Sequence, residues 1–219
     1  MVEYDKDAIV YPYITEYMRN EIPEHTGILA ELEEYAAKND IPIVQKETAQ
    51  LLSVITLAKR PVRILEVGCA IGYSAILMSQ GLAEGGTLTT IEWDADMAEI
   101  ARENIKRAGL SDVINVICGD AKDIMPTLTA EYDIIFLDGP KAHYIYMMND
   151  CIRLLKKGGL LIADNVLYKG MTADDAHVIR RKITIVKRLR RFISAQMQRD
   201  ELKTAILPLG DGVTVAVRI

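Results

Sequence analysis

Hydrophobic and polar positions divide the chain into two parts with different periods. Up to about residue 60, apolar side chains recur every three or four residues, which predicts amphipathic helices. From residue 62 onward, short β-branched runs alternate with helical stretches, and the predicted strands are 62–67, 87–91, 113–117, 133–137 and 159–163. Strands that are apolar almost throughout indicate a parallel sheet buried under helices on both faces.

The last two apolar runs differ from the others. Residues 204–207 and 213–218 are separated by Gly210-Asp211-Gly212, which is typical of a tight turn, so an antiparallel hairpin should close the sheet. Asp211 is interpreted as a turn residue. The chain has 219 residues, half of them hydrophobic, so we expect one domain over 1–219, with a helical section at 1–60 and an α/β core at 61–219.

Charge and cysteine content limit the classes of partner. The net charge is -5, so any nucleic-acid site must be a local basic patch, and we expect no DNA partner. Three widely spaced cysteines with no CxxC pair favour a reducing compartment over a disulfide framework or a zinc site. Residues 1–6 carry alternating charge and no apolar h-region follows, while no apolar run approaches the roughly 20 residues of a membrane span. We therefore expect an unprocessed cytoplasmic protein without a membrane partner.

Polar residues follow the first three predicted strands, at the edge where open α/β sheets bind ligands. Gly68 and Gly72 lie in a turn that leads into a helix, where the backbone and Ser74 could hold a carboxylate. Glu92 follows the second strand and could accept both ribose hydroxyls, and Asp120 follows the third and could accept from an adenine amino group. Each feature alone also fits a tight turn, a solvated charge or a loop aspartate. Together they predict one nucleoside site.

Two further strand ends carry oxygen ligands. Asp138 follows the fourth strand, and Asp164 and Asn165 follow the fifth. Two carboxylates and an amide oxygen suit Mg²⁺ and suit zinc or copper poorly. Loop caps are the alternative interpretation. The three histidines lack the spacing of a ligand cluster and are interpreted as ordinary surface or helix residues.

In this order, the motifs resemble the cation-dependent O-methyltransferases of the catechol and caffeoyl-CoA type, from about Pro42 to the end of the chain. The resemblance implies a Rossmann-like, seven-stranded S-adenosylmethionine (SAM)-dependent fold and methyl transfer to a hydroxyl oxygen. It also implies Mg²⁺, with Mn²⁺ or Ca²⁺ as alternatives, bound by Asp138, Asp164 and Asn165, Lys141 as general base, and a homodimer. The SAM-binding positions that it implies are Val44, Glu66, Gly68, Ser74, Glu92, Asp120, Ala121 and Asp138.

Four segments are more similar still to the bacterial tRNA 5-hydroxyuridine methyltransferases, which make wobble 5-methoxyuridine. They are 41–43, 70–76, 164–170 and 208–212. The uracil 5-hydroxyl and 4-carbonyl oxygens form a vicinal pair that one Mg²⁺ could chelate much as it chelates a catechol. Two alternatives stay open, namely a small-molecule catechol, phenol or caffeoyl-CoA-like O-methyltransferase and a non-catalytic binding module.

A basic segment near the C-terminus is the feature that favours tRNA. Residues 180–191 contain seven basic and no acidic residues. The helix face that we expect to be buried consists of Ile179, Ile183, Val186, Ile193 and Met197. This would leave Arg180, Lys187 and Arg191 on a separate stripe, close to Lys169, where they could contact phosphates. A solvated helix face is the alternative interpretation.

Overall fold

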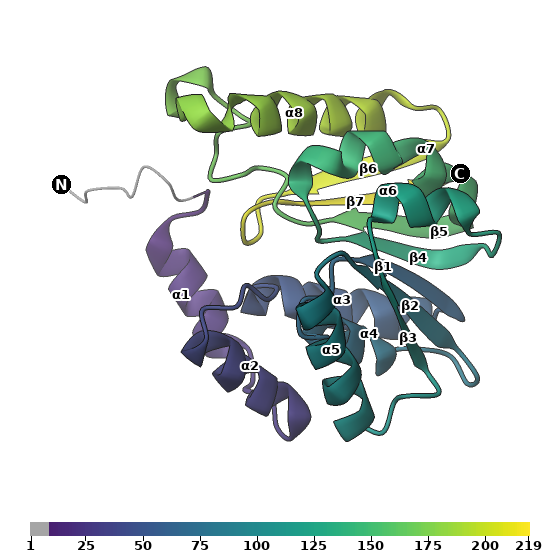
Figure 1. Ribbon diagram of the computed structural model, residues 1–219. Helices are drawn as coiled ribbons and strands as arrows, with labels where there is room; N and C mark the ends of the chain where they lie inside the picture. The colour runs from purple at the N-terminus through teal and green to yellow at the C-terminus, as the bar shows by residue number, and fades with distance from the viewer. Residues whose placement is uncertain (1–8) are drawn as a thin grey trace.

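The computed structural model describes residues 9–219, and its N-terminal part is helical (Figure 1). The first three helices are α1 (Pro12–Glu21), α2 (Ile28–Lys38) and α3 (Lys46–Lys59). The expectations for residues 1–6 lie outside the described residues. No helix within residues 9–219 is long and apolar enough to cross a membrane.

After α3, strands and helices alternate as the sequence predicts. The elements are β1 (Arg63–Val67), α4 (Tyr73–Ser79), β2 (Thr87–Glu92), α5 (Ala95–Arg107), β3 (Ile114–Cys118), α6 (Ala121–Ile124), η1 (Met125–Thr127), β4 (Tyr132–Leu137), η2 (Lys141–His143), α7 (Tyr144–Leu154), β5 (Leu155–Ala163), η3 (Asp175–His177), η4 (Arg180–Lys182), α8 (Ile183–Gln198), β6 (Leu202–Leu207) and β7 (Val213–Arg218).

The strands form one seven-stranded sheet in the order β3-β2-β1-β4-β5-β7-β6. Strands β1 to β5 pair in parallel, whereas β7 is antiparallel to both β5 and β6. The mostly parallel fold with its antiparallel end is therefore confirmed. In this order β1 and β4 are neighbouring central strands. Their carboxyl ends lie at the middle of the sheet edge where ligands bind in open α/β folds.

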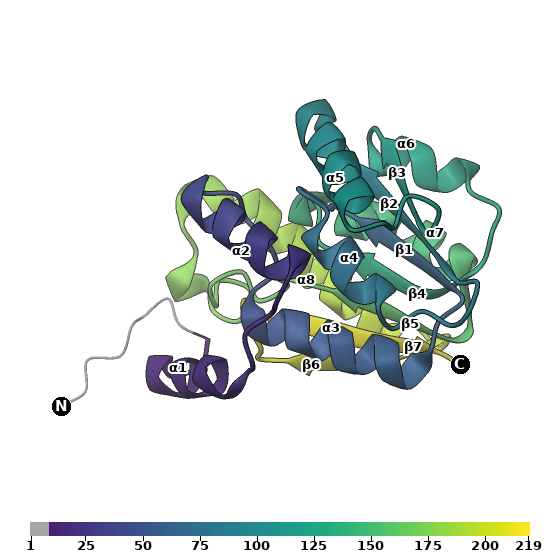
Figure 2. The ribbon, with the colours of Figure 1, turned by 90° about the horizontal axis from the view of Figure 1, so that it is seen from below.

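Helices cover both faces of the sheet (Figures 1 and 2). On one face, α2, α3, α4 and α5 enclose a hydrophobic core that includes Leu32, Leu52 and Phe136. On the other, α6, α7 and α8 enclose a second core that includes Met147, Leu189 and Phe192. These two layers hold the central strands, and so the functional edge, in a fixed position.

Strand β5 is longer than the sequence pattern predicts. It begins at Leu155 rather than residue 159, and Leu155 pairs with Tyr132 ahead of a register shift between Tyr132 and Ile134. The stretch Lys156-Lys157-Gly158 is polar and only partly covered, so it carries no apolar strand signal.

The predicted buried face of the basic helix is wrong at three positions. Ile179, Ile183 and Met197 are 50%, 39% and 52% exposed. The buried side chains of α8 are Val186, Leu189, Phe192 and Gln196. The prediction assumed one continuous helix through residue 179, whereas α8 begins only at Ile183, after the separate 3-10 turn η4. For the same reason, Arg180 does not share one helical stripe with Lys187 and Arg191.

Candidate functional site

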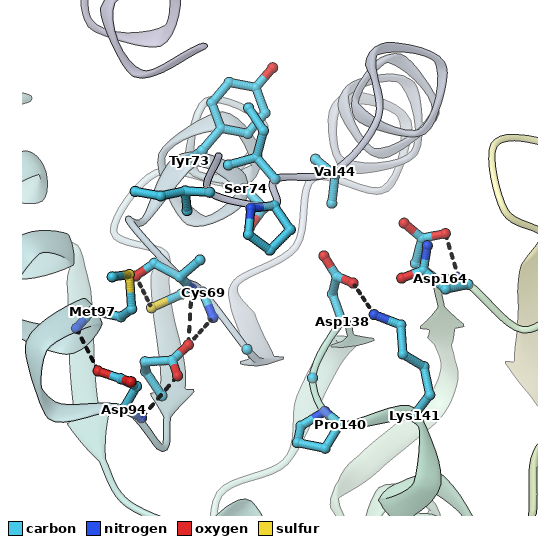
Figure 3. A pocket seen from close by; sticks show the side chains of 18 of the residues that line it. Val44, Cys69, Tyr73, Ser74, Asp94, Met97, Asp138, Pro140, Lys141 and Asp164 are labelled. Atoms are coloured by element: carbon cyan, nitrogen blue, oxygen red, sulfur yellow. Dashed lines mark hydrogen bonds and ion pairs between the residues drawn. The ribbon is translucent and has the colours of Figure 1, made fainter. Parts of the chain in front are cut away.

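A cavity of about 770 Å³ opens at the carboxyl ends of β1, β2, β4 and β5 (Figure 3). It brings together most of the predicted site residues, namely Val44, Gly68, Ser74, Glu92, Asp138, Lys141, Asp164 and Asn165. A second cavity of about 380 Å³ contains Asp120 and Ala121. The two share Gly68, Trp93 and Pro140, so they form adjoining parts of one binding region.

Gly68 is required by the packing of two neighbouring strand ends. Val67 pairs with Leu137, so the residue after each strand lies next to the other. Gly68 has a φ of +89°, and a Cβ atom there would lie 2.7 Å from the carbonyl oxygen of Asp138. Only glycine fits this position, which keeps the entrance between β1 and β4 open to a ligand.

Glu92 organises the turn between β1 and α4. Its carboxylate accepts the backbone N–H groups of Cys69 at 3.1 Å, Ala70 at 2.9 Å and Asp94 at 3.0 Å. A carboxylate offers about four acceptor positions, so about one is left for a ribose hydroxyl. The structure thus shows a second task for Glu92 that the sequence does not reveal.

Glu66 lies behind the cavity wall rather than on it. Its side chain is fully buried, and neither carboxylate oxygen has a hydrogen-bond partner of normal geometry among the described residues. Burial raises the pKa of Glu66 to about 7, although the nearby hydroxyls of Ser74 and Thr90 act in the opposite direction. Glu66 therefore contributes an uncompensated buried carboxyl beneath the glycine turn.

Asp120 caps the short helix α6 and lines the second cavity. Its carboxylate accepts the backbone N–H of Lys122 at 2.9 Å and lies 3.2 Å from the Lys122 ammonium group. The backbone hydrogen bond is the main reason that the pKa of Asp120 is lowered. Ala121 is buried beside it, in a pocket whose size and apolar walls suit a planar base.

The predicted metal ligands converge at neighbouring strand ends. Leu137 pairs with Ala163, so Asp138 and Asp164 directly follow the ends of adjacent strands, which lie about 4.8 Å apart, and Asn165 comes next. Figure 3 shows the side chains of Asp138, Lys141 and Asp164 side by side. Burial raises the pKa of both aspartates, and each is raised further by a nearby carboxylate. Two such carboxyls in one buried place favour a bound cation.

The arrangement fits a hard divalent cation. Among the described residues, no group of three or more His, Cys, Asp or Glu side chains is placed to hold a metal. The predicted set has two carboxylates and an amide oxygen, which leaves coordination positions for water and substrate, as is usual for Mg²⁺. Tyr144 supports it from below, because its hydroxyl donates to the carbonyl oxygen of Leu137 at 3.0 Å and lies 3.3 Å from that of Asp164.

Lys141 places its ammonium group beside Asp138. Its Nζ lies 3.9 Å from Asp138 Oδ1, and its side chain is 30% exposed. It lines the same cavity as both aspartates. Lys141 can therefore reach a molecule held at the carboxylate pair.

The predicted phosphate contacts lie outside the two cavities. Lys169 lines a third, outer groove of about 590 Å³ that shares Gln45, Asn165 and Asp211 with the main cavity. Arg180, Lys187 and Arg191 are exposed on η4 and α8. The structure therefore brings only Lys169 next to the site.

Sequence reasoning missed several cavity residues. Trp93 is 69% exposed and lines both cavities, His143 lines the second, and Gln45 and Asp211 line the first. Trp93 directly follows Glu92 and is the single tryptophan of the chain, which was a usable signal. Asp211 gave none, because its neighbours in space come from a distant segment.

Comparison with known proteins shows the family of this chain. Residues 19–219 match the model of the O-methyltransferase family. The chain is 38% identical over 135 residues to a catechol O-methyltransferase from Niastella koreensis, covering 60% of each protein, and 32% identical over 146 residues to one from Mycobacterium tuberculosis, covering 65% of the chain and 66% of that protein. The matches thus span less than two thirds of the length of these relatives.

The fold of the chain is also similar, over almost its whole length, to that of a solved structure. The O-methyltransferase from Bacillus cereus, in complex with SAH, superposes with a TM-score of 0.84 at 26% identity, over 94% of this chain and 97% of that one. Because the family model covers nearly the whole chain, the protein belongs to the O-methyltransferase family.

Proposed function

We propose that the protein is a SAM-dependent O-methyltransferase that needs a divalent cation, with Mg²⁺ as the physiological ion. The observation that carries this is the placement of Asp138, Asp164, Asn165 and Lys141 in one cavity with the glycine turn and Glu92. Family membership supports the reaction type. Relatives named catechol O-methyltransferase support an acceptor with two neighbouring oxygens.

The chain's residues divide the work between two sides of the cavity. When bound, SAM supplies the methyl group, and a divalent cation lowers the pKa of an acceptor hydroxyl. Gly68 and Glu92 shape the SAM side, and Trp93 offers a planar face at the junction with the second cavity. Asp138 and Asp164 would hold the cation, and Lys141, as the neutral amine, would take the hydroxyl proton at Nζ. The main contribution of the protein is to align the two substrates.

For the acceptor, the proposal is 5-hydroxyuridine at the wobble position of tRNA. Its support is the exposed basic surface of η4 and α8 together with Lys169, which lies beside the cation side of the cavity. Phosphates along an anticodon arm would be attracted by such a surface. The cavity would take only the flipped or unstacked base.

A small catechol is the second candidate, and the names of the curated relatives favour it. The same cavity would hold it through the same pair of oxygens. The difference lies outside the cavity, because a small catechol would not reach the basic residues of α8.

A competition between acceptors tests the proposal. Purified protein is incubated with radiolabelled SAM and Mg²⁺ and with either tRNA carrying 5-hydroxyuridine or 3,4-dihydroxybenzoate, and parallel samples contain EDTA. We expect kcat/KM for the tRNA to be roughly a hundredfold higher, with no transfer in EDTA. Faster methylation of dihydroxybenzoate would support the second candidate, and transfer that persists in EDTA would contradict the cation requirement. Loss of 5-methoxyuridine from the tRNA of a deletion strain would support the tRNA assignment in the cell.

A further inference from the structure

The segment that follows β5 carries an unusual concentration of left-handed backbone. Asn165, Tyr168 and Lys169 have φ values of 56°, 47° and 55°, although none is glycine. Asparagine tolerates this conformation better than most residues, whereas for Tyr168 and Lys169 it is unfavourable and persists where surrounding contacts impose it. The segment bears Asn165, the third oxygen ligand of the proposed cation site, so whatever imposes the conformation also places that ligand.

The contacts come from the turn between β6 and β7. The backbone N–H of Val166 donates to the carbonyl oxygen of Gly212 at 2.9 Å, and that of Leu167 donates to the carbonyl oxygen of Asp211 at 3.0 Å. The Asp211 carboxylate accepts the backbone N–H of Lys169. Three backbone amides of the segment are thus held by two residues of the turn.

Asp211 is the side chain that closes this connection. It is partly buried, and burial raises its pKa. It lines both the main cavity and the outer groove, as Asn165 does. The turn also packs directly against the segment, because Gly212 approaches Leu167 so closely that a Cβ atom there would overlap the Leu167 side chain.

We propose that Asp211 is a positioning residue, which fixes the left-handed segment after β5 through Lys169 N–H and thereby presents Asn165 to the cation. This inference rests on the cation site of the proposed function. It assigns to the β6–β7 turn a part in metal binding through a hydrogen bond rather than through coordination. The Asp211 carboxylate acts here as the acceptor of the Lys169 N–H. The amide of Asp211→Asn, which has the same shape and also offers an acceptor oxygen, should therefore preserve metal binding.

The test is Mn²⁺ binding, followed by the EPR signal of free Mn²⁺, in wild type and variants, with SAM affinity measured alongside. We expect Asp211→Ala to weaken Mn²⁺ binding by about tenfold or more and Asp211→Asn by less than about threefold, since partners that orient a ligand typically contribute about 10- to 100-fold. SAM affinity should change by less than about twofold in both Asp211 variants, because the contacts of Asp211 lie on the cation side of the cavity. If Asp211→Ala fails to fold, Asp211→Ser, whose side chain is too short to reach the same N–H, replaces it.

A double variant separates positioning from general stability. If Asp211 acts through Asn165, Asn165→Ala combined with Asp211→Ala should bind Mn²⁺ no more weakly than Asn165→Ala alone. Asp133→Ala is the matched control, because the Asp133 carboxylate also accepts backbone N–H groups, those of Val62 and Arg63, at the opposite edge of the sheet. It should leave Mn²⁺ affinity unchanged.

Four results would overturn the inference. Equal weakening in Asp211→Asn and Asp211→Ala would mean that charge acts on the cation, and additive effects in the double variant would mean a general effect. Unchanged binding in Asp211→Ala, with Asn165→Ala weakened, would refute the inference while the cation site stands. Absence of Mn²⁺ binding in the wild type would refute the cation site itself, and the inference with it.

Discussion

At the residue scale, the site depends on side chains that serve the backbone as well as a ligand. Glu92 accepts hydrogen bonds from three backbone amides. The Tyr144 hydroxyl lies between the carbonyl oxygens of Leu137 and Asp164, at the ends of β4 and β5. Such residues fix the positions of the groups that touch the ligand. For each substitution at the site, SAM binding and turnover should therefore be measured separately.

Trp93 gives a direct test of the SAM side. It is exposed, lines both cavities and is the single tryptophan, so titration with SAM should change the intrinsic fluorescence of the protein. Trp93→Ala should weaken SAM binding by about tenfold, since stacking of a base on an aromatic ring contributes about 1–3 kcal/mol. Trp93→Phe, which keeps a ring, should lose less. Equal affinity in Trp93→Ala and wild type, measured by calorimetry, would show that the ring does not contact the cofactor.

Lys141 separates chemistry from binding. Lys141→Ala should lower kcat by about 10²- to 10⁴-fold if the lysine takes the proton. The dissociation constant of SAM should change by less than about twofold, because Lys141 lies on the cation side of the cavity. Turnover equal to that of the wild type would remove Lys141 from the mechanism.

At the element scale, the strand pattern predicts the sheet well, because buried parallel strands are nearly continuous apolar runs. Adjacent strand ends then bring Asp138 and Asp164 together, which sequence order and register largely determine. The connection between the β6–β7 turn and the segment after β5 was not predictable, because it consists of hydrogen bonds between residues that lie about 42 positions apart in the sequence. The face of α8 was misassigned because the start of the helix carries no cap signal.

The basic residues of α8 look alike in sequence and differ in the structure. Arg190 donates to the carbonyl oxygens of Thr172 at 2.8 Å and Met171 at 3.1 Å and pairs with Asp175, whereas Lys187 and Arg191 are exposed. Arg190→Ala should lower the free energy of unfolding by about 1–2 kcal/mol. Lys187→Ala and Arg191→Ala should leave stability unchanged but weaken tRNA binding, and each should reduce the slope of log K against log salt by about 0.9. An unchanged slope in both would place the tRNA elsewhere.

At the scale of the whole molecule, the sheet edge that forms the site contains buried carboxyl groups, and their ionisation destabilises the folded state. Burial raises the pKa of Glu66 to about 7, above the value of about 4.3 in an unfolded chain. Between these values the folded state binds more protons than the unfolded state, so this group's contribution to stability is present at low pH and is lost as the pH rises through about 7.

Glu66→Gln should therefore gain stability relative to wild type as the pH rises. The difference in the free energy of unfolding should grow by on the order of 1–3 kcal/mol between about pH 4 and about pH 8, measured by urea denaturation without added metal. Glu131→Gln, at an exposed position, is the control and should show no such trend. A difference that stays constant with pH would contradict the burial of an ionising Glu66.

The central claim is that Asp138, Asp164 and Asn165 share one divalent cation beside the SAM cavity. Anomalous diffraction at the manganese edge, from crystals grown with SAM and MnCl₂, tests it most directly. The account predicts one strong peak within about 2.2 Å of an oxygen from each of the three side chains, in octahedral surroundings. A map without a peak at these three residues, at a Mn²⁺ concentration that supports methyl transfer, would contradict it.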